Sequence, residues 1–226
     1  MRAGYAFVSW LSRTYFRLTY GVALNGLENV PRTGKVILAS NHRSDYDPPI
    51  LGGIVRREVH FFAKEELFRH PVFGRFISYL NAFPVRRGQF DREALSKCLD
   101  VLKNEGALIF FPEGTRAPVD GFLKAKLGLG WVVCLSDAPV VPIYIHGSTE
   151  RGLRLRRRPT MSAVFGEAVP AADLKDESLR GKDLYQHVSD RVLELIRELS
   201  LATPGGKVTA RGPVYDRDVI QDQRLR

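Results

Sequence analysis

An imidazole and a carboxylate stand close together in residues 41–49, whose sequence is Asn-His-Arg-Ser-Asp-Tyr-Asp-Pro-Pro. On an unbroken helix the five steps from His42 to Asp47 turn by about 500°, so the two side chains would point about 140° apart. The prolines indicate that the backbone changes direction, because proline disfavours helix in the residue before it and fits the first helical position. We therefore expect Asp47 to be the N-cap of a helix that begins at Pro48, and His42 to lie on the loop that leaves a strand.

Such a pair could act as a general base at the carboxyl end of a strand, where open α/β sheets bind their ligands. The carboxylate would orient one ring nitrogen, and the other nitrogen would remove a proton from a hydroxyl. The same spacing also fits a structural histidine, with Asp47 acting only as a cap. Spacing alone leaves Asp45 open as a rival partner of His42.

A second group of residues that could do chemistry is Phe-Pro-Glu-Gly-Thr-Arg at 111–116, directly after an apolar run. Gly114 permits a tight turn, whose amides together with the guanidinium of Arg116 would form a pocket for an anion such as phosphate. We expect Glu113 either to hold Arg116 in place or to bond a substrate hydroxyl. The alternative is a solvent-facing turn with an ordinary Glu–Arg pair. Further basic residues are Arg86, Arg87, Lys124 and Lys126.

Short apolar runs alternate with longer segments of helical spacing along the chain. This alternation predicts an α/β fold with a mixed, largely parallel sheet flanked by helices. The predicted strands are 36–40, 59–63, 82–85, 107–111, 140–145 and 161–165. The predicted helices are 65–80, 90–104, 127–136 and 183–200.

The N-terminal segment, 1–25, contains a predicted amphipathic helix at 3–20, with no acidic residue among the first twenty. This helix either packs on its own domain or lies in a membrane interface, and the two can coexist. Its predicted apolar stripe consists of Phe7, Trp10, Leu11, Thr14, Tyr15 and Leu18. One domain is expected over 26–203. Residues 204–226 are polar and unpatterned, so we expect a flexible tail.

The composition narrows the classes of protein. The chain has 226 residues, 44% of them hydrophobic, which suffices for a core and excludes a wholly disordered protein. A formal net charge of +9 favours anionic partners, namely phosphorylated substrates, nucleic acid or acidic lipid headgroups, and the basic run at 151–158 adds to it. Cys98 and Cys134 form no disulfide framework and no metal-ligand cluster, which favours a reducing compartment. We find no apolar stretch that predicts a membrane span and no clear signal-peptide pattern.

Four ordered segments together resemble the glycerolipid acyltransferases, the 1-acyl-sn-glycerol-3-phosphate acyltransferase family. Asn41, His42 and Asp47 resemble the first block of that family, a His-x4-Asp motif, and Ser44 is also in its usual place. Residues 111–116 resemble the third block. The resemblance spans about residues 20–165.

The other two blocks are shorter. Residues 82–87 resemble the second block, in which a strand ends in an arginine, here Arg87. The residue before it is commonly aspartate in the family and is Arg86 in this chain, which weakens the assignment of the acceptor. Residues 141–143 resemble the fourth block, in which a proline, here Pro142, shapes the wall of the pocket.

The resemblance implies an O-acyltransferase that moves a fatty acyl group from acyl-CoA or acyl-carrier protein to the free hydroxyl of a lysophospholipid. The implied acceptor is 1-acylglycerol-3-phosphate, the implied product phosphatidic acid, the implied base His42, and the residue that orients it Asp47. No metal and no cofactor beyond the acyl donor are implied. The implied acceptor-phosphate residues are Arg87, Glu113, Gly114, Thr115 and Arg116. The implied supporting residues are Asn41, Ser44, Lys126 and Pro142.

Because lysophospholipid and product both live in the bilayer, the resemblance also implies a peripheral enzyme on the cytoplasmic face of the membrane. Residues 1–25 would then associate with the membrane, and 26–203 would be the acyltransferase domain. Anionic lipid headgroups are expected partners, and nucleic acid is not. Two alternatives stay open: an acyltransferase for another lysolipid, such as an ornithine-type or glycosylated lipid, and a non-catalytic basic lipid-binding module.

Overall fold

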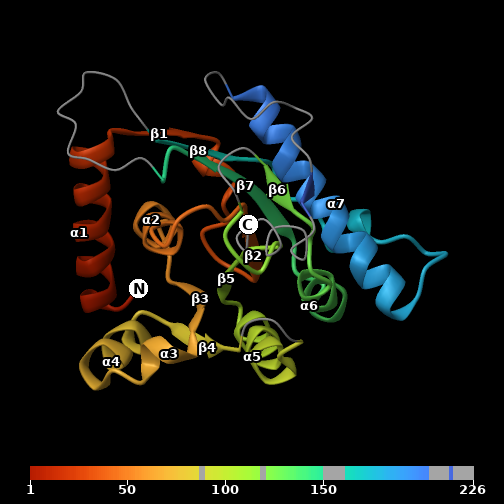
Figure 1. Ribbon diagram of the computed structural model, residues 1–226, viewed down its shortest axis with the longest axis horizontal. Coiled ribbons are helices and arrows are strands. Elements are labelled where there is room, and N and C mark those ends of the chain that lie inside the picture. The colour runs from red at the N-terminus through yellow and green to blue at the C-terminus, as the bar shows by residue number, and fades with distance from the viewer. Residues whose placement is uncertain (87–89, 118–120, 150–160, 204–213, 216–226) are drawn as a thin grey trace, which may run out of the picture.

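The computed structural model describes residues 1–86, 90–117, 121–149, 161–203 and 214–215. Seven strands form one twisted sheet in the order β1-β8-β7-β2-β5-β3-β4 (Figure 1). All neighbours are parallel except β7 and β8, which are antiparallel, so the predicted mixed and largely parallel sheet is confirmed. The strands are β1 (Val22–Asn25), β2 (Val36–Ser40), β3 (Val59–Lys64), β4 (Ala82–Val85), β5 (Ala107–Phe110), β7 (Val140–His146) and β8 (Met161–Phe165).

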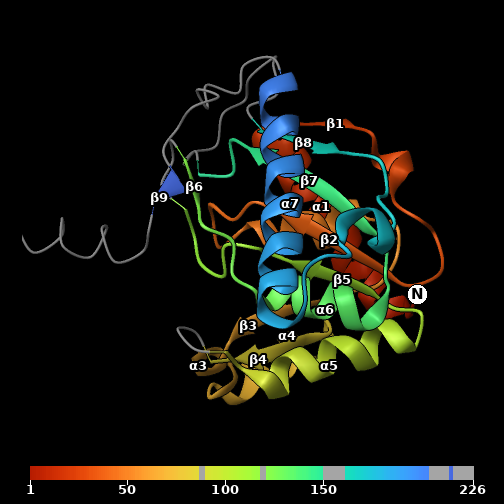
Figure 2. The ribbon, with the colours of Figure 1, turned by 90° about the vertical axis from the view of Figure 1, so that its right-hand side faces the viewer.

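Helices cover both faces of this sheet, and each face has its own core. On β2 the side chains alternate, so that Val36 and Leu38 pack towards α1 and α2, whereas Ile37 and Ala39 pack towards α5, α6 and α7. Figure 2 shows α7 lying along the second face. The helices are α1 (Ala3–Tyr20), α2 (Asp47–Ile54), α3 (Glu65–Phe68), α4 (Pro71–Tyr79), α5 (Arg92–Lys103), α6 (Gly128–Ser136) and α7 (Gly181–Ala202), with short 3₁₀ turns η1 (Leu27–Asn29) and η2 (Ala171–Leu174).

All six predicted strands are present, and the described residues contain three more that the sequence did not reveal. One is β1 at the edge of the main sheet. It lies on the N-terminal side of the boundary expected after residue 25, so part of the sheet comes from segment 1–25. The other two are β6 (Phe122–Leu123) and β9 (Val214–Tyr215), which pair with each other in a separate two-stranded sheet. Apart from β9, the predicted tail lies outside the described residues.

One predicted helix is divided. The pattern over 65–80 comprises α3 and α4, because the helix is interrupted at Arg69 and His70. Pro71 takes the first position of α4, and the ring of His70 caps that helix by accepting the N–H of Phe73 at 3.2 Å.

The N-terminal helix α1 packs against α2, on the left of Figure 1. Two hydroxyls join the helices: Ser9 Oγ donates to Gly52 O at 2.8 Å and Ser12 Oγ donates to Pro49 O at 2.7 Å. The buried side of α1 consists of Tyr5, Ser9, Phe16 and Thr19. The predicted apolar stripe lies on the other side and is exposed, apart from the half-buried Thr14. No helix in the described part of the chain has both the length and the apolar character that crossing a bilayer requires.

Candidate active site

The loop that leaves β2 carries the paired imidazole and carboxylate. His42 Nδ1 and Asp47 Oδ2 lie 2.9 Å apart, and both side chains are buried. The turn between them brings together two residues that a continuous helix would separate. The expected cap differs by one position: α2 begins at Asp47 itself, with Tyr46 as the N-cap, and Asp47 caps no later amide.

Asp47 instead closes the loop that precedes it. Its Oδ2 accepts the backbone N–H of Arg43 at 2.7 Å and that of Ser44 at 2.8 Å, in addition to His42 Nδ1. Three donors on one carboxylate oxygen fix the position of the side chain. Within the described residues Asp47 Oδ1 has no hydrogen-bond partner.

This geometry fixes the orientation of the imidazole. With Nδ1–H donating to Asp47, the lone pair of a neutral His42 ring lies on Nε2. The ring stacks on Phe111, with 4.2 Å between the ring centroids and 22° between the planes. The strand end at 111 was noted in the sequence, but its packing on the imidazole was not foreseen.

Two further residues of the loop hold its backbone. Asn41 Nδ2 donates to Ile145 O at 2.9 Å, and Asn41 Oδ1 accepts the N–H of Ile145 at 2.7 Å. Ser44 Oγ accepts the N–H of Tyr46 at 3.2 Å, at the start of α2. Both side chains are buried and bonded to main chain.

Glu113 lies beneath the loop and is 1% exposed. Its Oε1 accepts the N–H of His42 at 3.1 Å, and its Oε2 accepts the N–H of Leu123 at 2.7 Å. The expectation that Glu113 holds Arg116 is therefore wrong for this structure, since the carboxylate is bonded to buried main-chain amides. Burial raises the pKa of Glu113 to about 7, although the two amides and the nearby Arg43 oppose the rise.

Arg116 pairs with a different acid. Its Nη1 lies 2.6 Å from Asp45 Oδ2, and both side chains are largely exposed. Asp45, the rival partner of His42 in the sequence, is thus bonded to Arg116, and His42 is bonded to Asp47. The pair places the Arg116 guanidinium beside the loop that carries the imidazole.

The remaining residues of the third block shape the turn. Gly114 has φ +67°, a left-handed conformation that favours glycine, and a Cβ there would lie 3.4 Å from Lys126 Cγ. The N–H of Lys126 donates to Pro112 O at 2.8 Å, while its side chain is exposed. Thr115 is half-buried in the same turn.

The structure places one further predicted site residue away from this cluster, and another lies outside the described residues. Pro142 is buried within β7, opposite Ala39 of β2, where it belongs to the interior of the sheet. Arg87 and the basic run at 151–158 lie outside the described residues. The preceding residue, Arg86, is described, and its N–H donates to Asp91 Oδ2 at 2.9 Å.

Arg43 is a buried cation that sequence analysis missed. Its guanidinium lies 5.8 Å from the centre of the Phe122 ring and its Nη2 donates to Gly121 O at 3.4 Å. It follows the candidate base directly in sequence, and nothing in the spacing distinguished it from a solvated loop arginine. Its charge opposes the rise in the pKa of Glu113.

The cluster as a whole has the parts of a proton-transfer site. An oriented imidazole lies at the carboxyl end of β2, an arginine is placed beside it, and a buried carboxylate supports the backbone below. In the described part of the chain no group of three or more His, Cys, Asp and Glu side chains could hold a metal ion.

Comparison with known proteins gives the family. A family model described as Acyltransferase matches residues 21–146. A 1-acyl-sn-glycerol-3-phosphate acyltransferase of Bacillus subtilis is 28% identical over 196 residues, which is 86% of this chain and 96% of that protein. One from Pseudomonas aeruginosa is 34% identical over 201 residues, which is 86% of this chain and 75% of the relative.

A solved structure agrees with the sequence comparisons. The crystal structure of the 1-acyl-sn-glycerophosphate acyltransferase PlsC from Thermotoga maritima matches with a TM-score of 0.68 at 29% identity, covering 86% of this chain and 79% of that one. Fold and sequence together define an acyltransferase. The chain belongs to the 1-acyl-sn-glycerol-3-phosphate acyltransferase family and is an O-acyltransferase, which confirms the family and the enzyme class that the four blocks predicted.

Proposed function

We propose that the chain acylates 1-acylglycerol-3-phosphate to phosphatidic acid, with an acyl thioester of CoA or of acyl-carrier protein as donor. The observation that supports this most directly is the His42–Asp47 pair at 2.9 Å, with Arg116 placed beside the same loop. A base for the hydroxyl and a cation for the phosphate are the two groups that this acceptor needs. The names of the relatives support the same acceptor.

In the proposed reaction, His42 Nε2 removes the proton from the free hydroxyl while the hydroxyl oxygen attacks the thioester carbonyl. Asp47 stabilises the imidazolium that forms. The tetrahedral intermediate then loses the thiolate as the C–S bond breaks, and the proton on Nε2 passes to the leaving sulfur. Arg116 holds the phosphate of the acceptor, together with Arg87 and the turn at Gly114 and Thr115. No cofactor takes part beyond the donor itself.

We assign Glu113 a positioning role in place of the substrate contact implied by the resemblance. Its carboxylate bonds the N–H of His42 and is 1% exposed, so it acts on the base through the backbone. Glu113→Gln keeps the shape but leaves one of the two amides without an acceptor. The expected result is a lower kcat with an unchanged KM for the acceptor. A rise in KM alone would indicate direct contact with the acceptor.

The membrane contact is proposed for the outer side of α1. There Phe7 is 62% exposed, Trp10 51% and Leu18 72%, while Arg13 and Arg17 on the same helix are also exposed. Aromatic and aliphatic side chains flanked by arginine suit the interface of an anionic bilayer. We propose a peripheral enzyme on the cytoplasmic face, where the thioester donors occur.

The test is product analysis by mass spectrometry. The purified protein receives a mixed pool of lysolipids, with acyl-CoA and acyl-carrier protein donors in separate reactions. Phosphatidic acid is the expected product, and products made only from lysolipids that lack a phosphomonoester would refute the acceptor. His42→Ala should lower kcat by about 10²–10⁴-fold, whereas the exposed His187→Ala on α7 should not. Comparable turnover in both variants would remove His42 from the role of base.

A further inference from the structure

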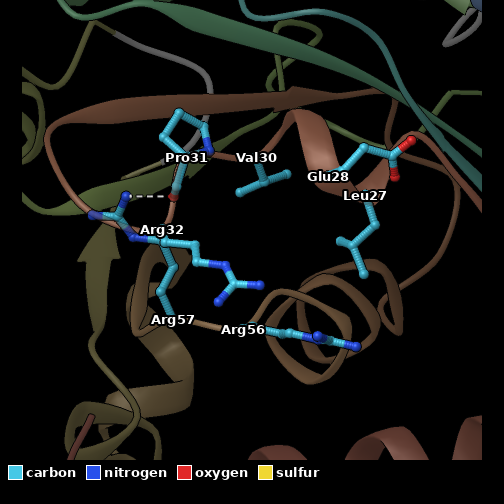
Figure 3. Close-up of a pocket in the computed structure, with 7 residues that line it drawn as sticks. All are labelled: Leu27, Glu28, Val30, Pro31, Arg32, Arg56 and Arg57. Carbon is cyan, nitrogen blue, oxygen red and sulfur yellow. Dashed lines mark hydrogen bonds between the residues drawn. The ribbon is translucent and has the colours of Figure 1, made fainter.

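A second basic site lies at the amino ends of the sheet strands, whereas the candidate active site lies at their carboxyl ends. It is a pocket of about 280 Å³ between the segment around η1 and the loop that joins α2 to β3 (Figure 3). This volume is just below the usual range for small-ligand pockets, about 300–1,000 Å³, so the pocket suits a small group. Its lining residues are Leu27, Glu28, Val30, Pro31, Arg32, Arg56 and Arg57.

The position of the pocket separates it from the reaction centre. Arg32 precedes β2 and Arg56 precedes β3, so both lie at the amino ends of parallel strands. His42 follows the carboxyl end of β2. Five strand residues at about 3.3 Å each put the two sites about 17 Å or more apart.

Arg57 builds one side of the pocket and is already hydrogen-bonded to three main-chain carbonyls. Its guanidinium donates to Pro31 O at 2.9 Å, to Gly34 O at 2.7 Å and to Glu105 O at 3.0 Å. These bonds tie the chain before β2 to the chain before β3, and they hold the guanidinium towards Pro31 as Figure 3 shows. Arg57 therefore contributes a fixed positive charge and a preformed shape.

Arg32 and Arg56 are the two arginines available to a ligand. Both are exposed, and among the described residues neither side chain has a hydrogen bond or an ion pair. Figure 3 shows the Arg32 guanidinium pointing towards the middle of the pocket, while Arg56 extends along the lower side of the pocket, beneath Leu27. Two unpaired cations that face one small pocket repel each other, and a bound anion would remove that repulsion.

The charge balance favours phosphate over a carboxylate. Three arginines against the single acid in the lining, Glu28, leave a net charge of +2, and a phosphate monoester carries about −1.5 to −2 at neutral pH. Guanidinium groups match phosphate oxygens in a bidentate manner. The apolar side chains of Leu27 and Val30 suit the carbon skeleton that carries the phosphate.

We propose that this pocket is a second phosphate-binding site, in which Arg32 and Arg56 bind the phosphate of a lipid headgroup or of a soluble phosphate compound. The site takes no part in acyl transfer.

The experiment measures the reactivity of each arginine towards phenylglyoxal, mapped by peptide mass spectrometry on the full chain. Inorganic pyrophosphate and vesicles of phosphatidylcholine with phosphatidic acid are added in separate arms. We expect protection of Arg32 and Arg56, while the exposed Arg92 on α5 stays reactive. Protection by pyrophosphate alone identifies a soluble source, and protection by vesicles alone identifies a lipid. Equal labelling of both arginines in every arm overturns the proposal.

A variant adds a quantitative check. Arg56→Ala should raise the concentration of the protecting probe that half-protects Arg32 by about tenfold, because one charge-assisted pair is lost. Arg92→Ala removes the same charge elsewhere and should leave that concentration unchanged. If Arg56→Ala has no effect on Arg32, the two arginines do not share a ligand and the proposal fails. Acyl transfer by Arg56→Ala should equal that of the unmodified chain.

Discussion

Replacing Glu113 by glutamine should change how the stability of the protein depends on pH. Burial raises the pKa of this carboxyl from 4.5 to about 7 in the folded chain. Between these two pH values the folded state keeps a proton that the unfolded state has lost, so the free energy of unfolding falls as pH rises. The difference of about 2.5 pH units corresponds to about 3 kcal/mol, at about 1.4 kcal/mol for each unit.

Glutamine is neutral at every pH, so it removes this contribution. We expect the stability of the unmodified chain relative to Glu113→Gln to be greatest near pH 4.5 and to decline by about 3 kcal/mol towards pH 8. Urea unfolding of both proteins across that range measures the difference. Glu167→Gln, at an exposed position, is the matched control and should show little such trend. A difference that is constant with pH, or that grows as pH rises, would refute the reasoning about this buried carboxyl.

Three further changes have defined outcomes. Asp47→Asn should lower kcat by about 10²–10⁴-fold at unchanged KM, since the imidazolium loses its counter-charge, and a steady-state assay measures this. Trp10→Ser should weaken sedimentation with anionic vesicles while leaving the melting temperature unchanged, because the ring is 51% exposed. Gly130→Ala should destabilise the fold by about 2 kcal/mol or more in urea unfolding, since its Cβ would lie 1.8 Å from Tyr185 O. Gly52→Ala is its control and should be tolerated, because its Cβ would have neighbours only at 3.8 Å.

The sheet was predictable where strands are buried on both faces. All five residues of β2 are buried, and the strand is a nearly continuous apolar run that can be recognised in the sequence. By contrast, three of the four residues of β1 are exposed at the sheet edge. An edge strand of that length has no distinctive hydrophobic pattern, and its pairing with β8 depends on contacts made across the chain.

The N-terminal helix shows a second reason why the sequence alone does not predict every contact. Its apolar stripe was recognised, but its buried side contains Tyr5, Ser9, Phe16 and Thr19, three of which carry a hydroxyl group. Hydropathy favours the more apolar side as the buried one, and here that expectation would be wrong. The hydroxyl of Ser9 is buried because it finds a main-chain carbonyl of α2, which only the tertiary structure supplies.

The pairing of the site residues was predictable in part. Two prolines indicated that the chain must turn between His42 and Asp47, and the structure has that turn. Two backbone amides that donate to one oxygen of Asp47 close this turn. Such local geometry cannot be read from the residue types alone. Glu113 was expected either to hold Arg116 or to bond a substrate hydroxyl, whereas its partners are amides that the fold brings to it from His42 and Leu123.

The side chain of Asn41 has a consequence for the whole reactive loop. Its carboxamide is chemically a copy of a peptide group, and by bonding both the N–H and the C=O of Ile145 it serves β7 as another rung of the ladder would. The main chain at Asn41 can therefore turn out of the sheet, while Ile145 of β7 still has a hydrogen-bond partner for both its N–H and its C=O. An aspartate could accept but not donate, and a glutamine would displace the amide by one methylene. Asparagine thus anchors the beginning of the loop to the rigid centre of the sheet, and the imidazole is the next residue along.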